Sequence, residues 1–203
     1  LSTMGKMAFK YGYLEMRAKV PTGVPIWPSL WLKSQESLRN SNYMTEVDIF
    51  EIFANNKLSS TYHKWYTGDH QQKSMGTALA LSANSSNEYH TYAMEWTPEY
   101  IKMYFDGTSY GTINANANFS KIDTEGSEIP GFGDPLYILL NSHVFTPGLQ
   151  ERKPEFVRDE WLVENYTGEF PIDYTVDYIR IYQSEAISNS KIYSETDIAA
   201  GNK

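Results

Sequence analysis

The stretch YGYLEMRAKV, residues 11–20, decides the fold class of this 203-residue chain. Apolar and polar side chains alternate strictly along it, and the apolar face is formed by Leu14, Met16, Ala18 and Val20. Such alternation is typical of a β-strand with one buried face. The PTGVP sequence that follows, residues 21–25, has the composition of a turn. This part of the chain therefore predicts a strand and a turn.

Similar patterns recur along the whole chain. Strand-like runs are predicted at residues 26–33, 45–53, 60–66, 76–82, 88–97, 100–105, 108–113, 136–144 and 174–182. Asp106 and Gly107 separate two of these runs, and a two-residue Asp-Gly connection is a strong signal of a tight hairpin. No long helical pattern is present, and one helical turn is expected within residues 159–164. Many short strands joined by turns predict an all-β sandwich or jelly roll.

The length of the chain fits a single domain. We assign residues 1–183 to one β-domain. Residues 184–203 are polar and rich in small side chains, and we expect them to be a C-terminal tail that adds little to the core. Two long segments without strand patterns, residues 114–134 and 145–173, interrupt the domain. Segments of this length are usually functional or disordered.

Composition excludes several classes of protein. The net charge of −8 disfavours binding to nucleic acid or to an anionic membrane surface. The mean hydropathy of −0.50 excludes a membrane span, which needs about 20 consecutive apolar residues. Without cysteine the chain forms neither disulfides nor thiolate metal sites. Aromatic residues make up 15% of the chain, enough to fill a core and still line a cleft. Residues 1–10 lack the pattern of a secretion signal, so we expect either a protein that is not exported or a processed form.

Three acids interrupt an otherwise apolar run of sequence. In EVDIFE, residues 46–51, a regular strand places Glu46 and Asp48 on one face and Glu51 on the other. A β-bulge at Ile49 and Phe50 adds the missing step and turns the following side chain back. With such a bulge all three acids face the same side, and at least one of the two bulged residues faces the core.

Paired carboxyl groups of this kind suit glycoside hydrolysis. Retaining glycosidases place two carboxyl groups about 5–5.5 Å apart, one as the nucleophile and one that arrives protonated to release the leaving sugar. An acid between them adds negative charge, which keeps the pKa of the proton donor high. On the residues alone, a calcium site or ion pairs across the sheet explain the same acids, and these alternatives remain open. The apolar flanks argue against a solvated edge strand.

Four blocks of the sequence resemble glycoside hydrolase family 16. They are FKYGYLEMRAKVPTGVPIWPSLWL (residues 9–32), EVDIFE (46–51), YHTYAMEWTPEYIKMYFDG (89–107) and VDYIRIYQ (176–183). The blocks occur in the order found in the family and span nearly the whole chain. The resemblance implies a concave, concanavalin-like β-jelly roll. It also implies an endo-acting, retaining hydrolase of β-linked glucans or galactans, and we expect a secreted or cell-surface protein.

The resemblance implies a role for each acid. Glu46 matches the nucleophile of the family, Glu51 its acid/base and Asp48 the helper acid between them. The six-residue spacing matches the bulged branch, which includes laminarinases, agarases, porphyranases, carrageenases and endo-β-galactosidases. Thr45 and the stretch at residues 141–145 depart from the laminarinase pattern, which favours the galactan-cutting relatives. A non-catalytic carbohydrate-binding jelly roll and a transglycosylase remain the alternatives.

Other side chains are candidates for substrate contact. Aromatic, histidine and amide residues occur in pairs whose spacing of two or four places both members on one strand face: Trp27 and Trp31, His63 and Trp65, and Asn141 and His143. Aromatic rings pack well against the CH face of a sugar. Packing into the core is the alternative for Trp27, Trp31 and His63.

The resemblance also bears on cofactors and partners. Asp177 matches the position of a structural calcium ligand in many members of the family, and a simple surface acid is the alternative. The predicted chemistry requires no cofactor. Family members usually carry strands before the first block, so we expect either missing strands or strands supplied by another chain, and otherwise a monomer. The predicted partner is a polysaccharide or glycan, and neither nucleic acid nor a membrane.

Overall fold

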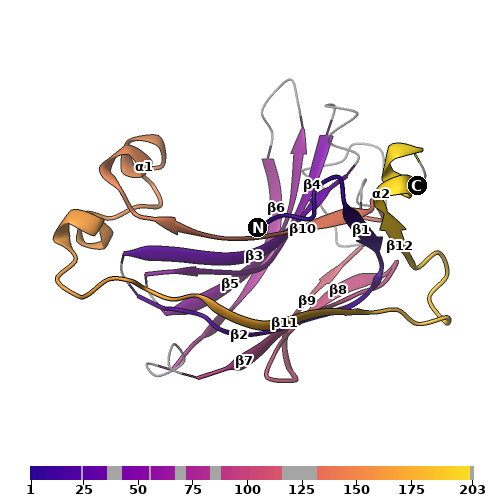
Figure 1. Ribbon diagram of the computed structural model, residues 1–203, viewed down its shortest axis with the longest axis horizontal. Coiled ribbons are helices and arrows are strands. Elements are labelled where there is room, and N and C mark those ends of the chain that lie inside the picture. The colour runs from indigo at the N-terminus through magenta and orange to yellow at the C-terminus, as the bar shows by residue number, and fades with distance from the viewer. Residues whose placement is uncertain are drawn as a thin grey trace.

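Two antiparallel β-sheets lie one on the other (Figure 1). The structure, a computed structural model, describes residues 1–23, 25–35, 43–54, 56–66, 72–82, 88–115 and 132–201, without the side chains of residues 43, 65, 66, 72 and 73. Within these residues one sheet has seven strands in the order β12-β1-β10-β3-β4-β5-β6. The other has five, in the order β11-β2-β7-β8-β9. The two-layer all-β architecture predicted from the sequence is confirmed.

The strands range from four to eleven residues, and every pairing is antiparallel among the described residues. The seven-stranded sheet consists of β1 (Met7–Lys10), β3 (Ile26–Ser34), β4 (Tyr43–Phe53), β5 (Lys57–Tyr66), β6 (Gln72–Ala80), β10 (Leu136–Val144) and β12 (Lys191–Ser194). The five-stranded sheet consists of β2 (Gly12–Lys19), β7 (His90–Trp96), β8 (Tyr100–Phe105), β9 (Thr108–Asn114) and β11 (Thr175–Tyr182). Asp106 and Gly107 both have positive φ angles, 47° and 73°, in the tight turn between β8 and β9. The predicted hairpin is therefore confirmed.

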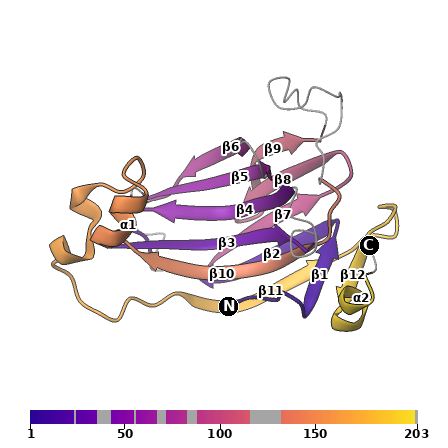
Figure 2. The ribbon, with the colours of Figure 1, turned by 90° about the horizontal axis from the view of Figure 1, so that it is seen from above.

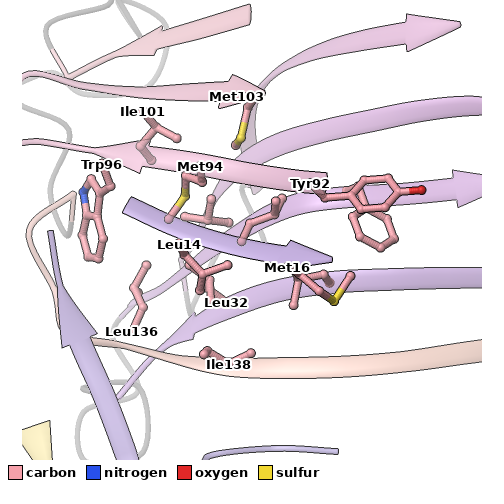
Figure 3. Packing of buried hydrophobic residues seen from close by; sticks show 14 of the residues in the cluster. Leu14, Met16, Leu32, Tyr92, Met94, Trp96, Ile101, Met103, Leu136 and Ile138 are labelled. Atoms are coloured by element: carbon pink, nitrogen blue, oxygen red, sulfur yellow. The ribbon is translucent and has the colours of Figure 1, made fainter. Parts of the chain in front are cut away.

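The core fills the space between the sheets. Side chains of β2 alternate between buried and half-buried positions, as the sequence pattern predicts. Leu14 and Met16 of β2 face Leu32 of β3 across this core, and Met94 of β7 lies beside them (Figure 3). Burial of one such side chain contributes roughly 1.5–3 kcal/mol to stability. Trp96 is also buried, and its indole N–H donates to the carbonyl of Phe132 at 3.0 Å.

The C-terminal segment corrects one expectation. Strand β12 pairs with β1 along its whole length, and helix α2 (Glu195–Ala199) follows it. Tyr193 and Ile198 are buried in a small cluster with Ala8 and Tyr137. The expectation that residues 184–203 add little to the core is therefore wrong, because a four-residue strand with one buried tyrosine extends the seven-stranded sheet.

The segment between β10 and β11 folds onto one end of the seven-stranded sheet. It contains α1 (Pro147–Arg152) and the 3₁₀ turns η3 (Asp159–Trp161) and η4 (Val163–Asn165). Phe145, Val157 and Leu162 form a separate buried cluster there. Figure 2 shows α1 beyond the ends of β3, β4 and β10. The other long segment predicted from the sequence lies mostly outside the described residues, at 116–131.

The helices of the structure are all short. In the part of the chain that the structure describes, none combines the length and the apolar composition that crossing a membrane requires. The helical turn predicted within residues 159–164 is present as η3 and η4.

Candidate active site

A bulge in β4 brings the three acids to one side of the sheet. Asp48 pairs with Thr61 of β5, and Glu51 pairs with Ser59, only two positions away. Two residues of β4 therefore occupy the length of one residue of β5. The same shift appears in the pairing of β4 with β3. The bulge predicted from the spacing of the acids is confirmed.

Two hydroxyl groups, those of Ser60 and Tyr110, stabilise the bulge. Ile49 and Phe50 point into the core, where both are buried. A bulge interrupts the hydrogen-bond ladder, and its polar groups then need other partners. The Ser60 hydroxyl donates to the carbonyl of Ile49 at 2.6 Å. The hydroxyl of Tyr110, from β9 of the opposite sheet, lies 2.6 Å from the Ser60 oxygen. Both sheets thus hold the bulge that directs Glu51 outward.

The acids lie in a cleft with a volume of about 460 Å³. Eight of the residues named from the sequence line it: Glu46, Asp48, Glu51, Trp27, Trp31, His63, Asn141 and His143. They come from β3, β4, β5 and β10, four neighbouring strands of the seven-stranded sheet. The sequence predicts from strand alternation which of these side chains share a strand face. In the structure, eight of the candidates lie in one cleft.

Two tryptophans hold polar groups of the cleft. The indole N–H of Trp27 donates to Glu51 Oε1 at 3.1 Å. The indole N–H of Trp31 donates to Asn141 Oδ1 at 2.6 Å. Both rings line the cleft and are only partly buried. Trp27 therefore orients the carboxyl group of Glu51, and Trp31 orients the Asn141 amide.

His63 connects Asp48 with the neighbouring strand. Its Nε2 lies 3.0 Å from Asp48 Oδ2, and its Nδ1 lies 2.7 Å from the hydroxyl oxygen of Ser74 on β6. Only 5% of the Asp48 side chain is exposed. The imidazole therefore lies between a buried carboxyl group and a hydroxyl, which fixes the orientation of its ring.

Burial changes the acidity of the site. Loss of solvent raises the pKa of Glu51 to about 8, and the nearby Asp48 adds to the rise. Burial raises the pKa of Asp48 to about 7. Burial lowers the pKa of His63, against the effect of Glu46 and Glu51. Glu51 thus keeps its proton at neutral pH, as a general acid must.

The same cluster is also the only candidate for a metal site among the described residues. Glu46, Asp48 and His63 each offer one ligand atom, and these atoms lie within 4.8 Å of one another. Two oxygen ligands and one imidazole suit a transition-metal ion better than calcium. The calcium alternative for these acids is thus weaker than an acid-base role.

Asp177 does not belong to the sheet that carries the cleft. It lies on β11, an edge strand of the five-stranded sheet. Its carboxylate is 2.6 Å from the guanidinium of Arg17. In the described part of the chain, no group of three acidic or histidine side chains includes it. Calcium takes about 6–8 oxygen ligands. The ion pair with Arg17 agrees with the surface-acid alternative, and the calcium role of Asp177 stays a prediction.

Other residues of the cleft were not singled out from the sequence. Phe53, Lys153 and Phe156 line it as well. Phe53 follows Glu51 by two positions on the same strand, so alternation after the bulge was a signal that could have identified it. Lys153 and Phe156 come from the segment after β10, where the sequence predicts no strand and only one helical turn, at residues 159–164. The side chain of Trp65 lies outside the described residues.

Known proteins resemble the chain over nearly its full length. It is 29% identical to a β-glucanase of Rhodothermus marinus over 191 residues, covering 90% of this chain and 61% of that protein. It is 25% identical to a keratan-sulfate endo-1,4-β-galactosidase of Sphingobacterium multivorum, covering 96% of this chain and 42% of that protein. The chain thus spans about two fifths to three fifths of the length of these relatives.

A solved structure shares the fold. The catalytic domain of an endo-1,3-β-glucanase (laminarinase) from Thermotoga petrophila superposes with a TM-score of 0.69 at 28% identity, covering 91% of this chain and 68% of that one. This likeness confirms the predicted jelly-roll sandwich. The model of glycosyl hydrolases family 16 matches residues 1–130, a segment that includes the whole bulged strand. The chain therefore belongs to glycosyl hydrolase family 16.

Proposed function

We propose that the chain is an endo-acting, retaining β-glycosidase that cleaves internal β-1,3 or β-1,4 linkages of a galactan or glucan. The observation that carries the proposal is the pair Glu46 and Glu51. Both acids line one cleft, and burial keeps the second acid protonated at neutral pH. A binding module needs no such pair.

Each acid then has one role in a double displacement. The carboxylate of Glu46 attacks the anomeric carbon and forms a covalent glycosyl-enzyme. At the same time Glu51 gives its proton to the glycosidic oxygen, so that the bond to the leaving sugar breaks. Glu51, now ionised, takes a proton from water, and the resulting hydroxide displaces Glu46 from the sugar. Both side chains return to their starting protonation states.

Trp27 determines which oxygen of Glu51 carries the proton. Its indole N–H donates to Oε1, and the carbonyl oxygen of a protonated carboxyl group is the stronger acceptor, so Oε1 is preferably the carbonyl oxygen. The acidic proton is thus held on Oε2. The same hydrogen bond favours the ionised form of Glu51 after the transfer. Trp27 therefore both orients the proton donor and stabilises the carboxylate it becomes.

Asp48 and His63 both change the pKa of Glu51, the proton donor of the pair Glu46 and Glu51. The charge of Asp48 raises the pKa of Glu51, whereas His63 lowers it. The contact between Asp48 and His63 couples the two effects. A shift of charge at either group therefore changes the fraction of Glu51 that holds its proton.

The substrate class is proposed from the relatives and from the sequence. The β-glucanase and the keratan-sulfate endo-1,4-β-galactosidase support the two halves of the proposal, glucan and galactan. The departures from the laminarinase pattern near Thr45 and at residues 141–145 favour a galactose-containing chain. Because such polymers occur outside the cell or at its surface, we propose a secreted or cell-surface location. No cofactor enters the proposed steps.

Product analysis on a panel of polysaccharides tests the proposal. Laminarin, mixed-linkage glucan, agarose, porphyran, carrageenan and keratan- or mucin-type glycans are incubated with the wild type and with Glu51→Gln. We expect one substrate to yield internal oligosaccharides that the variant does not release. Nuclear magnetic resonance of the first products should show the β-configuration. If all substrates stay intact while their oligosaccharides still bind, the chain is a carbohydrate-binding module instead.

A further inference from the structure

The cleft continues beyond Glu51 along an aromatic wall. The ring of Phe53 lies 4.8 Å from that of Trp27, between centroids, and the Trp27 indole is bonded to Glu51. The ring of Phe156 lies 6.3 Å from Phe53, with an angle of 13° between the two planes. Half of the Phe156 surface is exposed. A sugar unit in this part of the cleft therefore meets two stacked rings, of which that of Phe156 is half exposed.

A lysine stands at the end of this wall. Lys153 lines the cleft, and its Nζ lies 5.9 Å from the centre of the Phe156 ring. In the part of the chain that the structure describes, no carboxylate lies within 4.0 Å of this ammonium group. The charge of Lys153 is therefore available to a ligand in the cleft.

The backbone that carries these two residues is well supported. The carbonyl of Lys153 accepts hydrogen bonds from the N–H groups of Phe156 and Val157, at 3.0 and 3.1 Å. Val157 is buried against Phe145 and Leu162 at the end of the sheet. The turn is thus anchored to the same sheet that carries the acids, which gives the backbone of Lys153 and Phe156 a fixed place relative to Glu51.

The other charges of the cleft do not cancel this lysine. Glu46, Asp48 and Glu51 are its acids. Contacts run from Glu51 to the Trp27 indole, from there through the ring of Phe53 to that of Phe156, and from Phe156 to Lys153. The chain as a whole carries a net charge of −8, so an anionic ligand needs a local cation to bind here.

We propose that Lys153 and Phe156 form a subsite for a sugar unit that carries an anionic substituent, either a sulfate ester or a carboxylate. The inference rests on the proposed function, because the subsite extends the cleft of the proposed hydrolase. The Phe156 ring packs against the CH face of the sugar. The Lys153 ammonium donates charge-assisted hydrogen bonds to the anionic group. The subsite therefore distinguishes a substituted chain from a neutral one.

Binding of matched oligosaccharides tests the subsite. One neutral oligosaccharide from each of the galactan and glucan series is compared with its sulfate ester and with its C6-oxidised uronate. Calorimetry is done on Glu51→Gln, alone and combined with Lys153→Met, which keeps the aliphatic stem. Arg152→Met is the matched control, because Arg152 is the neighbouring exposed cation and does not line the cleft.

We expect one anionic form to bind about tenfold more tightly than its neutral parent, the low end of the range for hydrogen bonds to charged groups. Lys153→Met should reduce this preference to less than twofold, and Arg152→Met should leave it unchanged. The two anionic forms show whether sulfate or carboxylate is preferred. An equal affinity for charged and neutral forms, no binding of either, or a preference that survives in Lys153→Met overturns the subsite.

Hydrolysis by the wild type separates the two proposals. A neutral substrate that the wild type cleaves and Glu51→Gln does not cleave supports the proposed function, whereas the binding measurements alone decide the subsite. A clear anionic preference in binding, with no hydrolysis of any substrate, supports the subsite and contradicts the hydrolase.

Discussion

The two sheets carry acids of the same kind in opposite situations. On the outer face of the five-stranded sheet, the carboxylate of Glu95 accepts from the hydroxyls of Tyr100 and Tyr104, at 2.9 and 2.8 Å. On the same sheet, Arg17 and Asp177 form an exposed ion pair. These acids are paired with other side chains and stay at least partly exposed.

The acids of the cleft are held differently. Glu51 is bonded to one indole N–H, and Asp48 is buried against His63. Burial raises the pKa of both. Strand alternation places acids on both sheets, and only the surroundings distinguish the two groups. Burial without a strong cation makes an acid chemically useful, whereas pairing in water makes it structural. The following experiments test this contrast, starting with the largest expected effect.

Removal of the nucleophile should have the largest effect on activity. Glu46→Gln keeps the size of the side chain and removes its negative charge, so we expect kcat to fall by at least about 10³-fold. Glu95→Gln is the matched change on the other sheet, and we expect kcat to stay within about twofold. Initial rates on the substrate found in the panel measure both. Comparable losses in the two variants would contradict the distinction between the sheets.

The stability of the protein should fall as pH rises, because of Glu51. Its pKa is near the ordinary value of 4.5 in the unfolded chain and about 8 in the folded protein. Between these values the folded state binds more protons, so the free energy of unfolding decreases with increasing pH. The stabilisation present below pH 4.5 is lost as pH passes 8.

Glu51→Gln removes this dependence. Relative to the wild type, the variant should gain a few kcal/mol of stability on going from pH 5 to pH 9, the order expected from a shift of several pKa units. Urea unfolding at both pH values gives the comparison. An unchanged difference between variant and wild type would show that Glu51 titrates as an exposed acid.

The bulge should depend on the hydroxyl of Ser60. Ser60→Ala leaves the carbonyl of Ile49 without its 2.6 Å hydrogen bond, which should destabilise the protein by about 1–3 kcal/mol. Because a small displacement of a catalytic group is costly, we expect kcat to fall about tenfold with KM nearly unchanged. Tyr110→Phe keeps the Ser60 hydroxyl and should have a smaller effect. Full kcat in Ser60→Ala would show that the bulge holds Glu51 without this bond.

The rate profile should lose activity above about pH 8. Proton donation needs the protonated form of Glu51, whose pKa is about 8, so kcat/KM falls as that proton is lost. Trp27→Phe removes an N–H that favours the ionised form. The pKa of Glu51 should then rise further, and the alkaline limit should move to higher pH. A move to lower pH would contradict the role given to the indole.

The sequence predicts the site well where strand geometry alone decides it. Alternation with period two, together with the odd spacing of Asp48 and Glu51, requires a bulge if the acids are to act together. The same rule places Trp31 and Asn141 on cleft-facing positions of their strands. These predictions need only local backbone geometry, which the sequence determines strongly.

Other parts depend on contacts between distant segments. Tyr110 reaches the bulge from the opposite sheet, and no local pattern indicates which tyrosine does so. Lys153 and Phe156 enter the cleft because Val157 anchors an irregular segment to the end of the sheet. Strand β12 is four residues long, too short to show a reliable alternation. Tertiary packing, which has no signature in local sequence, decides all three.

The smallest effect is expected at Asp177. Its ion pair with Arg17 is 2.6 Å long, but both side chains are exposed, and such pairs contribute about 0–1 kcal/mol. Asp177→Asn should therefore leave kcat unchanged and the melting temperature nearly so. Addition of EDTA to the wild type should have no effect on either quantity, because the Asp177 carboxylate is already paired with Arg17. A lower melting temperature after EDTA that calcium restores in the wild type but not in Asp177→Asn would place a structural ion on the outer sheet. In that case Asp177 on the outer sheet, like the acids of the cleft, would depend on a specific partner. The difference in exposure alone would then not explain why the acids of the two sheets behave differently.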